Sequence, residues 1–273
     1  MSLPLVTVIT PAYNAAKFLP RVIATVRCQD DVLYEHIIVD DGSTDGSFDL
    51  LKEYARSDER IRLIRLEKNM GVVNARNEAI RAASGRFLAF LDADDEWMPQ
   101  KLSVQISFMQ HTDASITFSD YRFISESGHL IGRRLSGPSS IGWHLHHMTR
   151  YLGCLTIVID RSKFPDFSFG EISANYRAED FLAWSIAIKK NGKVLRCPYD
   201  LARYSVVHDS RSSDAIRAAK SVWKLYRHEE KISLFLSTLY FFSYISFATF
   251  KRYFYRPIYN RGEIDKYCHI NVL

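Results

Sequence analysis

Three carboxylates stand within four residues immediately after an apolar run. The run covers residues 87–91, and the carboxylates are Asp92, Asp94 and Asp95. Acids this close repel one another unless a cation lies among them, and carboxylate oxygens suit a hard divalent metal that also binds a phosphate. The cluster therefore predicts a Mg²⁺ or Mn²⁺ site for a phosphorylated ligand. The alternative is a solvated acidic turn before the helix expected near Pro99, because acidic side chains are favourable at helix N-termini.

An apolar strand has to position this cluster. Five of the six residues 87–92 are apolar, which is typical of a strand covered on both faces in a parallel sheet. The acids then lie just past the strand's C-terminal end, where open α/β sheets usually bind ligands. Polar turns follow two earlier expected strands in the same way, at residues 10–14 and 40–46.

Strand and helix patterns alternate through the first part of the chain. Expected strands cover residues 5–9, 34–39, 61–66 and 87–91, and expected helices cover residues 18–28, 48–54 and 72–83. Because parallel strands need crossover helices, the alternation predicts a doubly wound, Rossmann-like α/β fold with a mostly parallel sheet flanked by helices. No GxGxxG motif follows the first strand, which argues against a dinucleotide-dependent oxidoreductase.

The second part of the chain is expected to be less regular. We expect helices at residues 102–109 and 181–188, and strands at residues 114–118, 155–159 and 202–207. The strand at 155–159 is expected to make the sheet a mixed one. Residues 125–153 are rich in Gly, Ser, Arg and His, which indicates mobile loops over a cleft.

Composition places the chain among globular proteins. With 273 residues and 47% hydrophobic content it can bury a substantial core. Its four cysteines form no CxxC pair, so we expect neither a zinc site nor a disulfide framework, as in a reducing cytoplasm. The apolar N-terminus lacks a basic segment and runs into Pro11, so we expect no signal peptide.

Positive charge is concentrated in the C-terminal part. From Ala215 onward there are ten Lys/Arg and four Asp/Glu, a net charge of +6, and the whole chain carries +5, so the first 214 residues carry −1. A basic surface that tracks a nucleic acid is therefore not expected on the main domain, and we predict no nucleic-acid partner.

Four sequence blocks, taken in order, resemble a known enzyme family. They are Thr10-Pro-Ala-Tyr-Asn14, Val39-Asp-Asp-Gly-Ser-Thr-Asp45, Ala75-Arg-Asn77 with Gly85 and Phe90-Leu-Asp-Ala-Asp-Asp95, and Ala178-Glu-Asp180. Their order and spacing resemble the family 2 inverting glycosyltransferases with the GT-A fold, of the bacterial surface-polysaccharide type. The resemblance covers about three quarters of the chain, from Leu5 to roughly His208.

The resemblance implies roles for individual residues. The nucleotide-sugar donor is expected to contact Pro11, Ala12, Tyr13, Asn14, Asp41, Arg76, Asp92 and Ala93. Tyr13 would lie beside the base and Asp41 would accept from its N–H. Asp92-Ala-Asp94 matches the DxD signature, in which the second acid binds the metal and the first lies near the ribose or sugar.

Asp180 matches the catalytic base of the family. A single carboxylate that accepts the proton of an attacking hydroxyl, with no second carboxylate as nucleophile, gives inversion by one displacement. Asp180 could instead only complement a helix N-terminus, and Tyr13 could be a packing residue. Outside the motifs, we infer a metal-binding role for His208 and a diphosphate contact for Arg211. For His144, His146 and His147 we expect acceptor contact or simple exposure rather than metal binding.

The stretch at residues 232–250 contains nineteen uncharged residues between Lys231 and Lys251-Arg252. Its length is close to that of a membrane span, but six Ser/Thr lower its hydrophobicity. We expect a helix lying in the membrane interface with its basic residues on anionic lipid, and the alternatives are a helix packed on the domain or a spanning one.

The sequence thus predicts a catalytic domain at residues 1–213 and a basic, aromatic helical tail at residues 214–273. The domain is expected to comprise a nucleotide-binding half, residues 1–120, and an acceptor half, residues 121–213. The expected reaction moves a sugar from a UDP-hexose or UDP-N-acetylhexosamine to an undecaprenyl-diphosphate-linked saccharide, at the cytoplasmic face of the plasma membrane. The alternatives are a nucleotidyltransferase that makes a nucleotide sugar and a non-catalytic scaffold that binds one.

Overall fold

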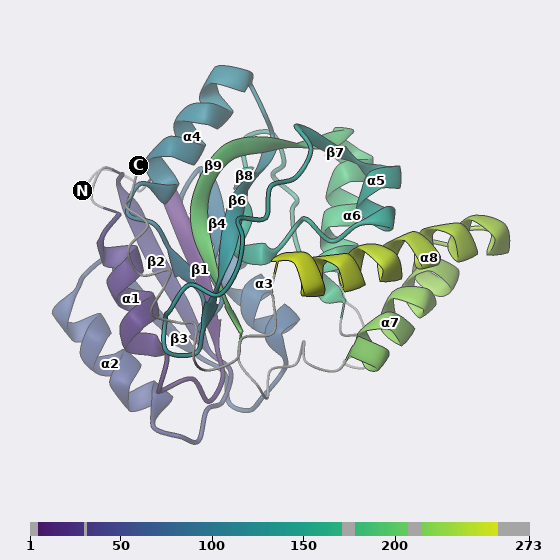
Figure 1. The fold of residues 1–273 in the computed structure, drawn as a ribbon. Helices are drawn as coiled ribbons and strands as arrows, with labels where there is room; N and C mark the ends of the chain where they lie inside the picture. The colour runs from purple at the N-terminus through teal and green to yellow at the C-terminus, as the bar shows by residue number, and fades with distance from the viewer. Residues whose placement is uncertain (1–4, 30–31, 171–177, 207–214, 256–273) are drawn as a thin grey trace.

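A single mixed sheet runs through the middle of the molecule, with helices on both of its faces (Figure 1). The computed structural model describes residues 5–29, 32–170, 178–206 and 215–255. Within these residues the strand order is β3-β2-β1-β4-β8-β6-β9-β5, with β7 paired to β9. The strands are β1 (Val6–Ala12), β2 (Tyr34–Asp40), β3 (Ile61–Arg65), β4 (Phe87–Phe90), β5 (Glu96–Trp97), β6 (Ile116–Ser125), β7 (Ser140–Gly142), β8 (Ile157–Asp160) and β9 (Lys193–Val206).

The first four strands with their crossover helices form the parallel part of the sheet. The helices here are α1 (Leu19–Arg27), α2 (Ser47–Ser57), α3 (Val72–Ala82) and α4 (Lys101–Thr112). Strand β1 pairs in parallel with β2 and with β4, with Ala12 opposite Asp40 and Ile9 opposite Phe90. The C-terminal ends of these strands therefore meet at one edge, as the alternating pattern predicted.

The second part makes the sheet mixed, also as predicted. Strand β8 runs antiparallel to β4 and to β6, whereas β6 and β9 are parallel to each other. Both long strands extend well beyond their predicted limits. They position helix α6 (Glu179–Asn191), whose end at Gly192 has φ +82°, a conformation that glycine adopts without strain.

The prediction of mobile loops over residues 125–153 is wrong for part of that range. This stretch contains β7 and helix α5 (Trp143–Met148). His146 and His147 are buried, and the ring of His146 stacks on Phe181 with centroids 4.1 Å apart. The expectation of simple exposure is therefore wrong for these two histidines, whereas acceptor contact stays a prediction for His146, which lines a cavity. Burial lowers the pKa of His146 to about 3, so its ring is a neutral packing group at physiological pH.

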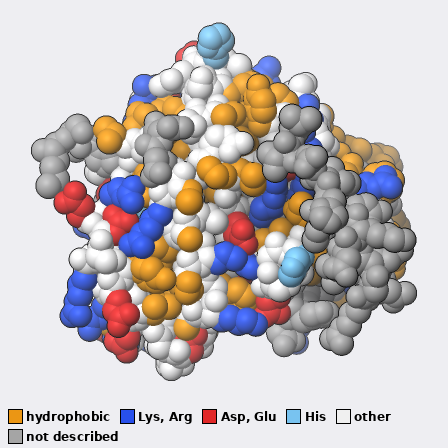
Figure 2. All heavy atoms as spheres, turned by 60° about the vertical axis from the view of Figure 1, so that its left-hand side comes forward, with side chains coloured by type: hydrophobic (Ala, Val, Ile, Leu, Met, Phe, Trp, Pro, Cys, Tyr) orange, Lys and Arg blue, Asp and Glu red, His pale blue; other side chains and the backbone are white. Residues whose placement is uncertain are grey.

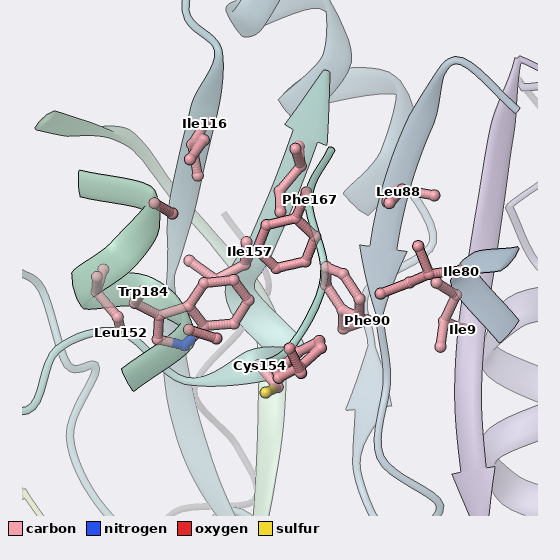
Figure 3. Packing of buried hydrophobic residues seen from close by; sticks show 14 of the residues in the cluster. Ile9, Ile80, Leu88, Phe90, Ile116, Leu152, Cys154, Ile157, Phe167 and Trp184 are labelled. Carbon is pink, nitrogen blue, oxygen red and sulfur yellow. The ribbon is translucent and has the colours of Figure 1, made fainter. Parts of the chain in front are cut away.

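Aromatic residues fill the core beneath the edge where the parallel strands end. Figure 3 shows Phe90, from β4, pointing toward Phe167 and toward Trp184 of α6. The ring of Phe90 lies 5.9 Å from each of those two rings, centroid to centroid. Each side chain is buried, and edge-on or tilted contacts at this spacing are favourable. Strand β4 is thus anchored directly against the helix that begins with Glu179.

Surface ion pairs contribute less to the stability of the fold than the buried core does. On the face in Figure 2, Lys/Arg and Asp/Glu side chains lie side by side among hydrophobic ones. Exposed or half-exposed pairs include Arg60 with Asp58, 3.0 Å apart, and Arg27 with the same carboxylate, also at 3.0 Å. Pairs of this kind are typically worth about 0–1 kcal/mol, so the buried core supplies most of the stability.

The C-terminal part is helical and packs on the domain. It comprises α7 (Ala215–Lys224), the π-helical turn η2 (Leu225–Glu229), α8 (Leu234–Phe250) and a second π-helical turn, η3 (Lys251–Tyr255). Figure 1 shows α7 and α8 running beside each other outside α5 and α6. Tyr240 and Tyr244 of α8 are buried against residues of α6 and η2, which confirms the packed alternative for one face of α8.

The opposite face of α8 is apolar and exposed. Phe235 is 78% exposed and Phe242 68%. No helix in the described parts of the chain has the length and apolar character needed to cross a membrane. Association of this face with a membrane surface, and the division of the chain at residue 213, stay predictions.

We predict that Phe90→Ala lowers the free energy of unfolding by about 3–5 kcal/mol, because it removes a fully buried ring and leaves a cavity. Urea unfolding of the purified protein measures the change. The matched control is Phe235→Ala, which removes an identical side chain that is 78% exposed and should change stability by no more than about 0.5 kcal/mol. Equal effects of the two substitutions would contradict the assignment of the core.

Candidate active site

The turns after β1 and β2 are joined to each other by hydrogen bonds. The backbone N–H of Asp41 donates to the carbonyl of Ala12 at 2.8 Å. The N–H of Asn14 donates to Oγ of Ser43 at 3.0 Å, and the N–H of Thr44 donates to Oδ1 of Asn14 at 2.8 Å. Asn14 adopts φ +47°, which its side chain tolerates better than most. The two turns therefore form one wall of the site.

Asp41 joins a third turn, which contains Met70 and Gly71, to this wall. Its two carboxylate oxygens accept hydrogen bonds from the N–H groups of Met70 and Gly71, at 2.7 and 2.8 Å. The side chain is buried, and burial raises its pKa although both N–H groups favour the ionised form. The adjacent Gly42 has φ +72°, and a Cβ there would lie 2.7 Å from the backbone carbon of Lys68, so only glycine fits.

The residues predicted to hold the nucleoside lie along this wall. Ala12 is buried, Pro11 is partly buried, and Tyr13 is 48% exposed. Tyr13 is thus not a packing residue, and its ring is available to a ligand. Contacts of these residues and of Asp41 with a nucleoside stay predictions.

The turn that follows β4 carries the carboxylates and is anchored by a buried arginine. Arg76 of α3 is only 4% exposed and donates from one terminal nitrogen to Oδ1 of Asp92 at 2.5 Å. Its guanidinium also lies 5.1 Å from the ring centroid of Phe169. Burial opposes the charge of Arg76, but Asp92, Cys154 and Glu179 together outweigh this cost and the pKa of Arg76 is raised. Arg76 therefore stays charged and positions Asp92.

The three carboxylates have different environments. Asp95 is 2% exposed and accepts the N–H of Ser205 at 2.8 Å, so it ties the turn to β9. Its pKa is raised well above the usual value by burial and then by Asp94 and Asp92. Asp94 is less buried, and burial followed by the charge of Asp92 raises its pKa to about 6.

Asp92 and Asp94 are the side chains of this turn that fit a divalent cation. They present carboxylate oxygens, which hard cations prefer, and a cation between them would relieve the repulsion that raises the pKa of Asp94. In the described parts of the chain, no three His, Cys, Asp or Glu side chains form a complete metal site. A cation here would need further ligands, such as phosphate oxygens and water. His208 and Arg211, the other predicted ligands, lie outside the described residues.

Arg21 of α1 also supports this turn, and sequence reasoning did not identify it. One terminal nitrogen of its guanidinium donates to the carbonyl of Asp94 at 3.2 Å and to Oγ of Ser205 at 3.0 Å. Its Nε lies 2.6 Å from a carboxylate oxygen of Glu96. The sequence gives no signal for this role, because Arg21 occurs in an ordinary amphipathic helix whose basic residues could all be solvated.

Asp180 is the second residue of α6 and lies near the carboxylate turn. Its Oδ1 accepts the N–H of Phe181 at 2.7 Å, and the residue lines a cavity of about 800 Å³. The carboxylates of Asp92 and Asp180 both act on the buried thiol of Cys154: burial raises its pKa, Arg76 opposes the shift, and Asp92 and Asp180 add to it. Figure 3 shows Cys154 close to Phe90, at the end of β4. Asp92 and Asp180, 88 residues apart in the sequence, therefore both lie near one buried side chain.

This arrangement has a known counterpart among protein families. Residues 7–166 match the family described as Glycosyl transferase family 2. The chain belongs to this family. It is accordingly a glycosyltransferase, and the matched segment includes the carboxylate turn and the wall formed by the turns after β1 and β2.

Two curated glycosyltransferases are similar to this one over most of their length. The putative teichuronic acid biosynthesis glycosyltransferase TuaG of Bacillus subtilis is 36% identical over 249 residues, covering 91% of this chain and 98% of that protein. The Escherichia coli enzyme WfgD, named as a UDP-Glc:α-D-GlcNAc-diphosphoundecaprenol β-1,3-glucosyltransferase, is 33% identical over 220 residues. That match covers 80% of this chain and 84% of WfgD.

Solved structures support the predicted GT-A fold. TarS 1-349 of S. aureus, in a complex with UDP-GlcNAc, superposes with a TM-score of 0.66 at 17% sequence identity. The match covers 97% of this glycosyltransferase and 76% of that chain. At this identity the likeness concerns the fold alone, and it extends over the C-terminal helices as well as the sheet.

We predict that Arg21→Gln lowers the free energy of unfolding by about 1–3 kcal/mol, because partly buried acceptors lose their donor. It should also lower sugar transfer, since the carbonyl of Asp94 loses its support. The matched control is Lys17→Gln, near the same helix, whose exposed side chain pairs only with Glu126 and should change stability by about 0.5 kcal/mol or less. Urea unfolding and a transfer assay measure both variants. Indistinguishable variants would contradict the role of Arg21.

Proposed function

We propose that the enzyme transfers a sugar from a nucleotide sugar, a UDP-hexose or UDP-N-acetylhexosamine, to a hydroxyl of a lipid-linked saccharide, with inversion. The product would serve O-antigen, capsule or exopolysaccharide synthesis. The observation that carries the proposal is that Asp92, which interacts with Asp94, and Asp180 both lie near buried Cys154, so the donor-side acids and a candidate base belong to one site. The names of TuaG and WfgD support a cell-surface polysaccharide and a diphosphoundecaprenol-linked acceptor.

The donor would lie along the edge formed by the turns after β1, β2 and β4. Tyr13 would stack beside the base, Asp41 would face its N–H, and Asp92 would lie near the ribose or sugar. Mg²⁺ or Mn²⁺ held by Asp94 and Asp92 would offset the negative charge that develops on the departing nucleoside diphosphate. Arg76 would keep Asp92 oriented, because its guanidinium is itself held inside the protein.

The acceptor hydroxyl would approach from the cavity on the other side, where Asp180 can take its proton. The short hydrogen bond from the N–H of Phe181 orients the carboxylate. A base on the side opposite the donor phosphates suits an in-line attack on the anomeric carbon. Of the carboxylates in the turn after β4, Arg76 holds Asp92, β9 holds Asp95, and Asp94 would bind the cation, so the proposal assigns none of these three as a nucleophile.

The exposed face of α8 would bring this site to the membrane. Contiguous apolar surface on a globular protein usually marks an interaction site, and the exposed residues Lys231 and Arg252 flank this one. Such a helix would lie at the cytoplasmic surface of the plasma membrane with its basic residues near anionic headgroups. Removal of the tail is unsuitable as a test, because Tyr240 and Tyr244 belong to the core.

We predict that Asp180→Asn lowers the transfer rate by roughly 10²–10⁴, the usual contribution of a general base. Donor affinity should barely change, because the carboxylate acts mainly in the transition state. Transfer to an N-acetylglucosaminyl diphosphate lipid and titration with the nucleotide sugar measure the two quantities.

Two controls make this experiment specific. Glu179→Gln changes the neighbouring acid and should leave the rate within a few-fold of the parental rate. Excess chelator should stop transfer by the parental enzyme, and Mg²⁺ or Mn²⁺ should restore it. Near-parental transfer by Asp180→Asn, or a product mixture containing pyrophosphate instead of a nucleoside diphosphate, would contradict the proposed function.

A further inference from the structure

The cavity next to Asp180 has a large excess of basic side chains. Its volume is about 800 Å³, and its described walls come from β6, β9, α5, α6, α7, α8 and η3. Among the described lining residues, Arg150, Lys220, Lys251 and Arg252 are basic, and Asp180 is the single carboxylate. A concave site with this charge favours a ligand that carries more than one negative charge.

Two of these basic groups are held close together. Nζ of Lys251 donates to the backbone carbonyl of Arg150 at 3.1 Å. Lys251 also lies over the rings of Tyr121 and Phe123, with Nζ 5.2 and 5.8 Å from their centroids, and the guanidinium of Arg150 lies 5.3 Å from the ring of Tyr244. Burial and then the neighbouring Arg150 lower the pKa of Lys251 to about 7. An anion between Arg150 and Lys251 would offset their mutual repulsion and would stabilise the charged form of Lys251.

The position of Lys251 is fixed by the fold of the tail. Lys251 is the first residue of the π-helical turn η3, which continues α8. The N–H of Arg133 donates to the carbonyl of Tyr255 at 3.0 Å, and the guanidinium of Arg133 stacks 4.5 Å from the ring of Phe254. The end of the turn is therefore bound to the catalytic domain.

We propose that this cavity binds the diphosphate of the lipid-linked acceptor, with Arg150 and Lys251 contacting its phosphoryl oxygens while the acceptor sugar reaches Asp180. This inference rests on the proposed function. In this arrangement the sugar hydroxyl of the acceptor lies at Asp180 and the diphosphate lies on Arg150 and Lys251. The hydrocarbon chain extends toward the apolar face of α8.

The nucleotide-sugar donor also carries a diphosphate that could bind to basic side chains. The position of the cavity favours the diphosphate of the acceptor. Within the described residues, none of Pro11 to Asn14, Asp41, Arg76 or the carboxylate turn at residues 92–95 lines the cavity. The predicted donor residues therefore do not belong to the lining of the basic cavity, whereas Asp180 does. A diphosphate in the cavity would also need no divalent cation, because the lining already supplies the positive charge.

The test is a binding titration without turnover, supported by a transfer assay. N-acetylglucosaminyl diphosphate with a short alkyl chain is titrated into the full-length protein in excess chelator and without donor. We expect Lys251→Gln to weaken its binding about ten- to hundred-fold, the effect of losing a charge-assisted hydrogen bond. The matching alkyl glycoside without phosphates should bind the parental enzyme and the variant equally.

Two further variants and two further measurements separate charge from packing. Lys251→Arg retains the charge and should restore most of the affinity, whereas Lys224→Gln removes a similar charge that is exposed on α7 outside the cavity lining and should have no effect. Donor titration in the presence of Mg²⁺ should be unchanged in Lys251→Gln. Urea unfolding shows whether that variant remains folded.

Each outcome decides between the assignments. Unchanged binding of the diphosphate compound to folded Lys251→Gln, or an equal loss with the phosphate-free glycoside, overturns the inference. Weakened donor binding instead assigns the cations to the donor and also overturns it. Diphosphate binding that depends on Lys251, combined with no sugar transfer from any nucleotide sugar, supports the site and contradicts the proposed function.

Discussion

The ion pair between the buried Arg76 and the partly exposed Asp92 is the interaction on which the site depends. Strand β4 ends in a low-dielectric region with three carboxylates in succession, and their repulsion raises the pKa values of Asp94 and Asp95. A fixed guanidinium offsets part of this repulsion without filling the space above the turn. Breaking such a pair by removing one partner typically costs about 3–5 kcal/mol. The fold thus stabilises one carboxylate and leaves Asp94 in a state that a divalent cation would stabilise further.

The core beneath the site links this ion pair to the opposite side of the catalytic centre. Phe90 contacts Trp184 of α6, and Asp180 begins the same helix. The strand that carries the donor-side acids and the helix that carries the proposed base are therefore fixed by one cluster of rings. Precise distances between reacting groups need such a rigid support, because small displacements cost large factors in rate.

Much of the fold and part of the site could be predicted from the sequence. The alternation of strands and helices gave the parallel half, because local hydrophobic periodicity determines those elements. The acids after β4 were identified since a polar cluster directly after a buried run has few structural explanations. The sequence did not predict the roles proposed for Arg21, Arg150 and Lys251. Their importance arises from contacts with residues 73 or more positions away. His146 and His147 were misinterpreted for the same reason, since α5 is ordered by packing on α6.

The tail is part of this architecture rather than an appendage. One face of α8 completes the core next to α6, the other face is exposed and apolar, and the turn that follows it places Lys251 in the cavity beside Asp180. A single helix could therefore couple contact with a lipid surface to the presentation of an acceptor. In this account, the residues that approach a membrane and Lys251, one of the residues that bind the acceptor, belong to one continuous segment.

The anomeric configuration of the product tests the central claim most directly. A UDP-α-sugar is supplied as donor with the N-acetylglucosaminyl diphosphate acceptor, and the new linkage is determined by NMR. One base on the acceptor side and no nucleophilic carboxylate on the donor side predict a single displacement, and hence a β-linked product. An α-linked product would contradict the account, because retention would require a donor-side nucleophile or a front-face mechanism that this arrangement of Asp92, Asp94 and Asp180 does not provide.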